Sequence, residues 1–497
     1  MFPFLTVLIA LPAIGAAVLW FLPASARTRV REIALGITGA ELLIALIMLW
    51  QFDTADAGAH QFAELHAWIP QIGASWALGI NGIGLLLVLL AVILTPLALV
   101  AGWREDTDVK RRTQYLALIL LSLSFMVGIF AARDVFLFYV LFEAMLIPVY
   151  FLIGAFGGEQ RRYAAVKFLL YSLAGGLIML VAVIALYFMG PGGSQAYLTD
   201  NLTGIDYGVV PERLMFLAFF LAFAIKAPMV PLHTWLPTVA ETARVGTTAL
   251  LVSVLDKVGT FGMLTLCLVL FPEASRWAAP VIIVFAVVSV IYGALLAIGQ
   301  EDMLRMVAFT SVSHFGIIVL GIFAFQQTSI EGAAFYMFNH GLATAALFLL
   351  VGFLIARTGS ASIHAYGGLQ KVAPVLAGTF LVVGMAVLAL PGLSPFISEI
   401  MVLIGAYPVA PAAVIVSAVS VVLAALYILI AYQRVFTGPT PDEHGGTREI
   451  TLRERIAVWP LMALMLVLGF LPALAIDVLR DPSADIVSIV STQEAGE

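Results

Sequence analysis

Hydrophobic residues in this chain gather into long runs that short polar stretches separate. Each run is close to the ~20 residues that a helix needs to cross the ~30 Å hydrocarbon core of a bilayer. The runs fall at residues 3–22, 33–52, 82–102, 114–131, 135–156, 164–190, 212–229, 245–271, 278–299, 306–325, 332–356, 373–405, 411–433 and 456–476. We therefore predict an all-α membrane protein with about fourteen transmembrane helices.

The positions of the basic residues predict how these spans are oriented. If the N-terminus lies outside, alternate loops face the cytoplasm, and seventeen of the 24 Lys and Arg residues fall in those loops. Four fall in outer loops or span ends, and three, Lys167, Lys226 and Lys257, fall within spans. Because basic residues concentrate in cytoplasmic loops, we predict a multi-pass membrane protein with both termini on the outer side. No basic residue precedes the first run, so we expect a retained span rather than a signal peptide.

Composition excludes several classes of protein. Hydrophobic residues make up 62% of the 497 residues and charged residues only 11%, against about 25% charged residues in soluble domains. A single cysteine, Cys267, excludes internal disulfides and a cluster held by several thiolates. We find no metal-spaced cluster and no nucleic-acid signature. The stretch LGINGIG (78–84) resembles a phosphate-binding loop only superficially, since we expect no strand before it.

Proline and glycine interrupt two of the expected spans. In AIKAPMVPLHTWLP (224–237), Pro228 and Pro231 have no N–H to donate, so the helix is expected to fail just after Lys226. In LPGLSPFISE (390–399), Pro391, Gly392 and Pro395 interrupt the twelfth span. Broken backbone within a membrane is tolerated only where protein or water satisfies it.

The two interruptions lie in the seventh and twelfth spans, five spans apart, and would enter the membrane from opposite sides. We therefore predict two inverted five-helix repeats, each with a broken helix, which is the arrangement that places an ion site at the midplane. The expected divisions are three N-terminal helices (1–112), a first repeat (113–271, broken near 227–231), a second repeat (277–436, broken near 391–395) and a C-terminal helix with a tail (452–497).

Ionisable residues recur inside the expected spans. A charge near the centre of a bilayer costs about 2.5–3.5 kcal/mol on insertion scales and is a functional candidate by default. A single structural Glu–Lys pair explains such a series less readily than a transport path does. The candidates are Glu143, Lys226, Lys257, His314, His340 and Glu399.

Three further residues are weaker candidates. His233 lies on the cytoplasmic side of the first interruption, where it is a candidate for a proton uptake path. Glu41, in the second span, suits a lateral contact to another subunit. Asp256 precedes Lys257, but adjacent helical residues point about 100° apart, so the two side chains can face different neighbours.

This combination of residue types suits proton transfer. Burial disfavours the charged form of a lysine and a nearby carboxylate favours it, so a buried lysine holds or releases a proton when its partner moves. Histidine titrates nearest to neutrality, which suits a relay between such groups.

These residues lie in motifs that resemble the antiporter-like subunits of respiratory complex I and the related multisubunit cation/proton antiporters. The resemblance covers nearly the whole chain. The stretches that carry it are WIPQIGASWALGINGIG (68–84), FYVLFEAMLIPVYFLIG (138–154), KAPMVPLHTWLP (226–237), AFTSVSHFGIIVLG (308–321), FNHGLATAALFLLVG (338–352) and LPGLSPFISE (390–399). A glutamate in the twelfth span, and a chain that ends at the fourteenth, resemble one subunit type within this family.

The resemblance implies a role for each candidate. Glu143 would pair with Lys226, the gating lysine; Lys257 would connect them to a relay of His314 and His340; and Glu399 would be the terminal carboxylate. It implies a non-redox, proton-translocating subunit with no cofactor of its own. FMN, iron–sulfur clusters and quinone are expected in partner subunits. The expected partners are the other membrane subunits, notably two further antiporter-like ones, together with lipids and protons but no nucleic acid.

Three other interpretations stay open at this point. The chain could belong to a free-standing Na⁺/H⁺ antiporter, which has no redox partners. An intramembrane enzyme such as an acyltransferase would instead have a catalytic histidine in a pocket at headgroup level. A structural spacer would tolerate neutral replacements of its buried charges.

Overall fold

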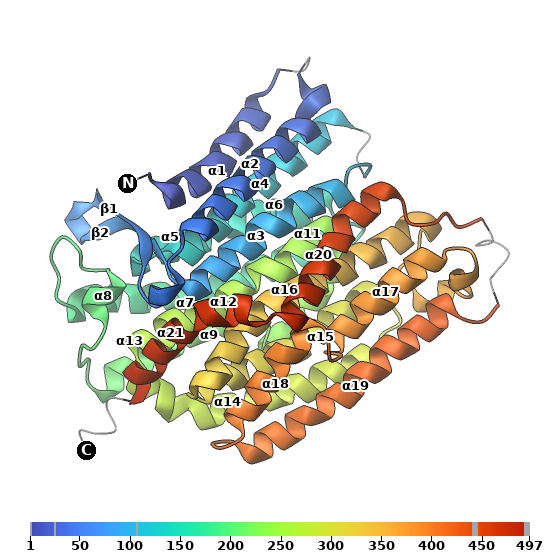
Figure 1. Ribbon diagram of the computed structural model, residues 1–497. Coiled ribbons are helices and arrows are strands. Elements are labelled where there is room, and N and C mark those ends of the chain that lie inside the picture. The colour runs from blue at the N-terminus through green and yellow to red at the C-terminus, as the bar shows by residue number, and fades with distance from the viewer. Residues whose placement is uncertain (1, 24–25, 106–107, 440–445, 492–497) are drawn as a thin grey trace.

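Long helices that run side by side make up most of this chain (Figure 1). The computed structural model describes residues 2–23, 26–105, 108–439 and 446–491. Within these ranges, eleven helices are long and apolar enough to cross a membrane. A twelfth span results if α20 (Leu452–Phe470) and α21 (Ala473–Ser491), which are bent by 70°, count as one. The predicted all-α membrane architecture is confirmed.

The two expected spans outside this count are the broken ones. The seventh consists of α9 (Val209–Lys226) and α10 (Trp235–Thr242), and the twelfth of α17 (Pro374–Val387) and α18 (Ser394–Ala406). Helices α10, α17 and α18 are shorter than a full span, and α9 carries three charged residues, Glu212, Arg213 and Lys226. The count of fourteen therefore stays a prediction, although a helix or a helix pair occupies each predicted run.

The N-terminal part contains α1 (Phe4–Phe21), α2 (Val30–Gln51) and α3 (Gly82–Ala101). Between α2 and α3, strands β1 (Gln61–Ile69) and β2 (Ala74–Ile80) form an antiparallel hairpin in which His66 pairs with Trp76. The expectation that no strand precedes LGINGIG was therefore wrong. Its glycines nevertheless begin a membrane helix, because Asn81 caps α3 by accepting a hydrogen bond from the Gly84 N–H at 3.1 Å.

The first predicted repeat contains five spans. The first three spans are α4 (Val109–Ala131), the pair α5 (Val135–Ala144) and α6 (Leu146–Phe156), and α7 (Arg161–Met189). The fourth is the pair α9 and α10. The fifth contains α11 (Val245–Leu250), α12 (Lys257–Gly262) and α13 (Leu268–Leu270). A short helix, α8 (Thr199–Leu202), lies between α7 and α9. The last span contains two π-helical segments, Leu251–Leu255 and Met263–Cys267. Such π-segments inside α-helices are frequent at functional sites.

The second predicted repeat also contains five spans. They are α14 (Pro272–Ile298), α15 (Met303–Phe323), α16 (Gln327–Thr358), α17 with α18, and α19 (Pro411–Phe436). Helix α15 lies deepest: every residue in its most apolar window is buried, against 28% for Arg27–Gln51 and 33% for α19. The interior of the bundle therefore lies around α15, α16 and α11–α13. The division boundaries given above stay predictions.

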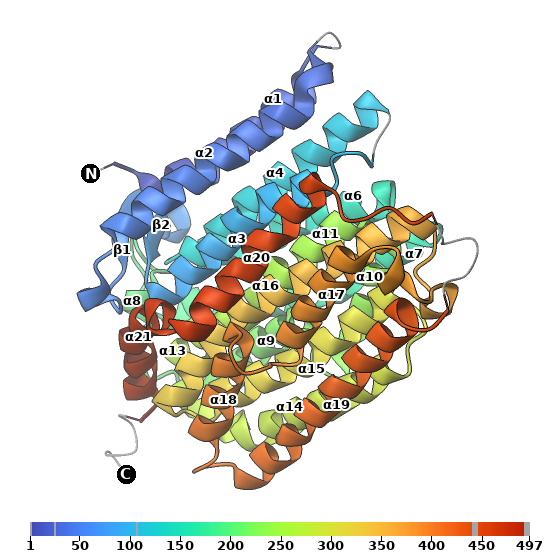
Figure 2. The ribbon, with the colours of Figure 1, turned by 45° about the vertical axis from the view of Figure 1, so that its right-hand side comes forward.

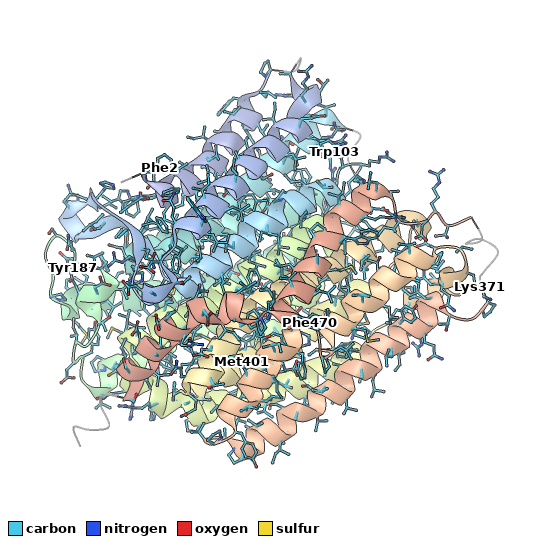
Figure 3. All side chains as sticks on the ribbon, in the orientation of Figure 1. Phe2, Trp103, Tyr187, Lys371, Met401 and Phe470 are labelled. Carbon is cyan, nitrogen blue, oxygen red and sulfur yellow. The ribbon has the colours of Figure 1, made fainter. Side chains whose placement is uncertain are left out.

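The two ends of the bundle differ in character. The hairpin, α8 and α21 gather at one end (Figures 1 and 2), where Asp134 accepts a 2.8 Å hydrogen bond from the Ser75 N–H. The labelled Phe2 and Tyr187 lie toward this end, whereas Trp103 and Lys371 lie toward the other (Figure 3). At that other end, Arg357 forms a buried ion pair with Glu454 at 2.6 Å. Which end faces the cytoplasm stays a prediction.

The C-terminal segment contains a helix that the sequence did not lead us to expect. Residues 477–491 were assigned to a tail, but α21 continues through them and buries Val478, Leu479 and Ile486. It packs so closely on the start of α3 that a Cβ at Gly82 would lie 1.6 Å from the carbonyl oxygen of Val478. Glycine at position 82 permits this approach.

Candidate functional site

Lys226 is the last residue of α9, at the first predicted interruption. The helix ends there because Pro228 supplies no N–H, and the Met229 N–H instead bonds to the carbonyl of Ala224 at 3.0 Å. The Trp235 indole holds the far side of the interruption by donating to the Ile225 carbonyl at 2.9 Å. The predicted break after Lys226 is confirmed.

The Lys226 side chain is fully buried. Its Nζ lies 4.9 Å from the centroid of the Phe168 ring and 5.3 Å from that of Phe142. Within the described residues, Nζ has no hydrogen-bond partner. Aromatic faces attract a cation, and the negative end of the α9 dipole lies at this terminus. The ammonium group is therefore held by diffuse electrostatic attraction and not by a fixed hydrogen bond.

Glu143 lies in the last turn of α5, just before the junction with α6 at Met145. Its carboxylate presses against α7, since a Cβ at Gly176 would lie 1.6 Å from its Oε1. Glu143 exerts an electrostatic effect on Lys226, yet no ion pair within 4 Å joins the two among the described residues. The structure thus places the predicted pair in one neighbourhood but not in direct contact.

Lys257 begins α12, directly after the first π-segment and Asp256. Its fully buried Nζ lies 2.7 Å from the carbonyl oxygen of Val252 and 2.7 Å from His340 Nδ1. The Phe315 ring lies 4.7 Å away. Because an ammonium group only donates, Nδ1 accepts in this bond, and the ring proton lies on Nε2, which is 3.2 Å from Thr344 Oγ1. The predicted contact between the lysine and the histidine relay is direct.

The two histidines lie against each other inside the second repeat. The rings of His314, on α15, and His340, on α16, are perpendicular with centroids 5.3 Å apart. His314 Nε2 also shares a 3.3 Å hydrogen bond with the hydroxyl of Tyr427, on α19.

Tyr336, a residue that the sequence analysis did not single out, connects the histidines to Glu399. Its hydroxyl donates a 2.9 Å hydrogen bond to Glu399 Oε2, and its ring lies 5.8 Å from that of His314. Tyr336 precedes His340 by four residues, so both lie on one face of α16. That spacing is a signal that sequence reasoning can use.

The second interruption positions Glu399. It covers residues 388–393, slightly earlier than predicted, because Pro395 lies in the first turn of α18 and not within the break. Proline at that position loses no helical hydrogen bond. Asn339, beside His340 on α16, holds the start of α18 by donating to the Ser394 carbonyl at 3.1 Å and to Ser398 Oγ at 3.2 Å.

Two of the three weaker candidates, His233 and Glu41, lie apart from this series. His233 is buried between Tyr292 and Phe309, with ring centroids 5.3 and 6.2 Å away. Neither neighbour is one of the predicted residues. Glu41 is fully buried in α2, and neither of its carboxylate oxygens has a hydrogen-bond partner in the described part of the chain.

No three His, Cys, Asp or Glu side chains among the described residues gather as a metal site. The lysine, histidine, tyrosine and glutamate side chains assembled here are titratable groups. From Lys257 to Glu399 they form one contiguous series through α12, α16, α15 and α18. We call this series, together with Glu143 and Lys226, the buried polar axis.

Comparisons with known proteins identify the family. The family model described as NADH:quinone oxidoreductase/Mrp antiporter, TM, matches residues 132–426, and the chain belongs to this family. NADH-quinone oxidoreductase subunit M of Mycobacterium tuberculosis is 45% identical over 513 residues, covering 96% of this chain and 93% of that protein. The subunit M of Rhodobacter capsulatus is 37% identical, covering 97% and 96%. The resemblance to antiporter-like subunits of complex I, and among them to subunit M, is confirmed.

Solved structures agree with this assignment. A chain of respiratory complex I from Thermus thermophilus superposes with a TM-score of 0.87 at 30% identity, covering 97% of this chain and 99% of that one. A chain of the Mrp complex from Dietzia sp. superposes with a TM-score of 0.86 at 22% identity, covering 98% of both. The second similarity is evidence for the fold alone.

Proposed function

We propose that this chain is the subunit M type of antiporter-like subunit in a bacterial NADH:quinone oxidoreductase and translocates protons along the buried polar axis. The observation that carries the proposal is the unbroken series of contacts from Lys257 through His340, His314 and Tyr336 to Glu399. Each neighbour in it is a group that both accepts and donates a proton. The series crosses the most deeply buried part of the bundle, where an isolated charge is costly.

In this mechanism Lys226 and Lys257 hold protons and the rings carry them onward. When the Lys257 ammonium passes a proton to His340 Nδ1, the ring releases its Nε2 proton toward Thr344 or, after rotation, toward His314. Tyr336 and Glu399 receive the proton at the far end of the series. Glu143 acts on Lys226 from α5, so a change in their separation changes how firmly Lys226 holds its proton.

The partner subunits complete the proposal. This chain contributes no redox step, and FMN, iron–sulfur clusters and quinone reside in other subunits of the complex. The chain lies in the bacterial plasma membrane with both termini on the outer side, and its partners are the other membrane subunits, notably two further antiporter-like ones. The family model includes both kinds of protein, and the identities of 45% and 37% to subunit M proteins over nearly the whole chain support this assignment over a free-standing Na⁺/H⁺ antiporter.

Membrane vesicles that oxidise NADH test the proposal. Lys226→Ala should abolish NADH-driven proton uptake while the complex still assembles, whereas Lys371→Ala, which removes an exposed lysine from a loop, should pump as the wild type does. Full pumping by an assembled Lys226→Ala complex would refute the mechanism. A pH change driven by added Na⁺ in vesicles without NADH would favour the antiporter alternative instead.

A further inference from the structure

Asp256 is a buried acid that the mechanism above does not use. It lies between the π-segment Leu251–Leu255 and α12, directly before Lys257, and its side chain is fully buried. Neither carboxylate oxygen has a hydrogen-bond partner within the described residues. An ionised carboxylate in such a place is costly unless a charge nearby compensates it.

The two axis lysines offset part of that cost. Asp256 is an electrostatic neighbour of Lys257 and also of Lys226. The packing explains why: a Cβ at Gly259, one turn beyond Asp256, would lie 2.6 Å from the backbone nitrogen of Ala227, the residue after Lys226. Glycine at 259 thus brings the Asp256 turn against the end of α9, and Asp256 lies where the two lysine-bearing helices meet.

Two other buried acids, Asp134 and Glu454, are bonded differently. Asp134 accepts from the backbone N–H groups of Ser75 and Leu137 at 2.8 and 2.9 Å. Glu454 accepts two hydrogen bonds from Arg357, at 3.0 and 2.6 Å. Fixed bonds of this kind hold helices together. Asp256 has none of them among the described residues, so no hydrogen bond in this part of the chain fixes its carboxylate toward one lysine or the other.

We propose that Asp256 carries protons between Lys226 and Lys257, as a further member of the buried polar axis. The Lys226 ammonium gives a proton to the Asp256 carboxylate, which breaks an N–H bond, forms an O–H bond and leaves a neutral amine and a neutral acid. Rotation about the Asp256 side-chain torsions then presents the acid to a neutral Lys257 amine. There the O–H bond breaks and an N–H bond forms, which restores the carboxylate. This inference rests on the proposed function.

The number of charges fits this step. Two carboxylates, Glu143 and Asp256, face two lysines at the start of the axis. The step starts with Lys257 as a neutral amine, so two carboxylates face one ammonium group, and the net charge of the group stays constant because the proton moves within it. Asp256 gives the proton an intermediate site between Lys226 and Lys257, while the start and end states are the same as in a direct transfer.

The test uses the assembled complex in NADH-oxidising vesicles. Asp256→Asn, which keeps the shape and removes the titrating group, should lower proton uptake per NADH at least fivefold, and Asp256→Glu should restore at least half of it. Glu212→Gln, which alters a buried acid that caps α14 through the Ala274 N–H, should pump normally. Lys226→Ala is measured beside these variants.

The outcomes separate the inference from the proposed function. If Lys226→Ala stops pumping while Asp256→Asn pumps normally, the proton does not pass through Asp256 and the proposed function stands. If Lys226→Ala also pumps normally, the proposed function itself fails. If Asp256→Asn does not assemble, infrared difference spectra of turnover in the Asp256→Glu complex decide: a carboxylic-acid band shifted from its wild-type frequency supports the inference, and an unshifted band overturns it.

Discussion

The Nζ of Lys257 and the Nδ1 of His340 lie 2.7 Å apart, and this hydrogen bond joins the last span of the first repeat to the centre of the second. It is the direct contact between a lysine and the histidine relay. Replacing His340 by Ala leaves the ammonium group with the Val252 carbonyl as its one remaining hydrogen-bond partner among the described residues.

We therefore expect His340→Ala to lower NADH-driven proton uptake at least tenfold in assembled complexes. Loss of one partner of a buried hydrogen bond costs about 1–3 kcal/mol, so the melting temperature of the complex should also fall. Proton uptake in vesicles and a thermal scan measure the two effects. Thr344→Val, which removes the hydroxyl partner of His340 Nε2, should also lower proton uptake and the melting temperature, but by less. A His340→Ala complex with normal uptake would show that protons bypass the ring.

Gly176 has no room for a side chain because Glu143 occupies the space. With a Cβ placed 1.6 Å from Glu143 Oε1, Gly176→Ala should displace the carboxylate and impair pumping nearly as much as Glu143→Ala does. Gly378→Ala is the matched control, since a Cβ there meets no atom within 4 Å. Alanine is the better helix former by about 0.5–1 kcal/mol, so the control should be neutral or slightly more stable. Equal activity of the two variants would mean that the position of Glu143 does not matter.

Tyr336 is expected to act through its hydroxyl. Tyr336→Phe removes the 2.9 Å bond to Glu399 and keeps the ring, so pumping should fall severalfold with little change in assembly. Glu399→Gln should have a similar effect, and the double variant should be no worse than the more impaired single variant, because both interrupt one link. Tyr407→Phe, at an exposed position, is the control. Additive losses in the double variant would place the two residues on separate routes.

Arg357 and Glu454 form a clamp that is separate from the axis. The ion pair joins the end of α16 to the start of α20 with side chains only 9% and 5% exposed. Removing one partner of a buried ion pair typically destabilises by about 3–5 kcal/mol. Arg357→Met should therefore lower the thermal stability of the assembled complex, and adding Glu454→Leu should recover part of the loss. Proton uptake per NADH should stay normal in whatever complex assembles, as measured in the same vesicles.

Much of the fold could be predicted from the hydrophobic pattern because a bilayer imposes one requirement on every span. Length and apolarity therefore located the runs, and proline chemistry located the break after Lys226. The hairpin was missed because β1 does not alternate strictly between apolar and polar residues. Helix α21 was missed because aspartates and Pro482 interrupt its apolar positions, although its buried face repeats with helical spacing.

The site was predicted in part. Charged residues inside a membrane are conspicuous, so Lys226, Lys257 and Glu399 stood out. Tyr336 did not, because tyrosine is common in apolar spans and its importance depends on which group its hydroxyl reaches. Asp256 was noted but could not be placed, since its position between two lysines depends on how closely α12 approaches α9, and Gly259 sets that approach.

The end of α20 lies against the interruption between α17 and α18. A Cβ at Gly469 would lie only 2.3 Å from the carbonyl oxygen of Gly392, so two backbones meet there with no side chain between them. Such a contact is stiff, because no flexible group is present to absorb a displacement. A displacement of the interruption that positions Glu399 is therefore transmitted directly to the end of α20, next to the 70° bend between α20 and α21.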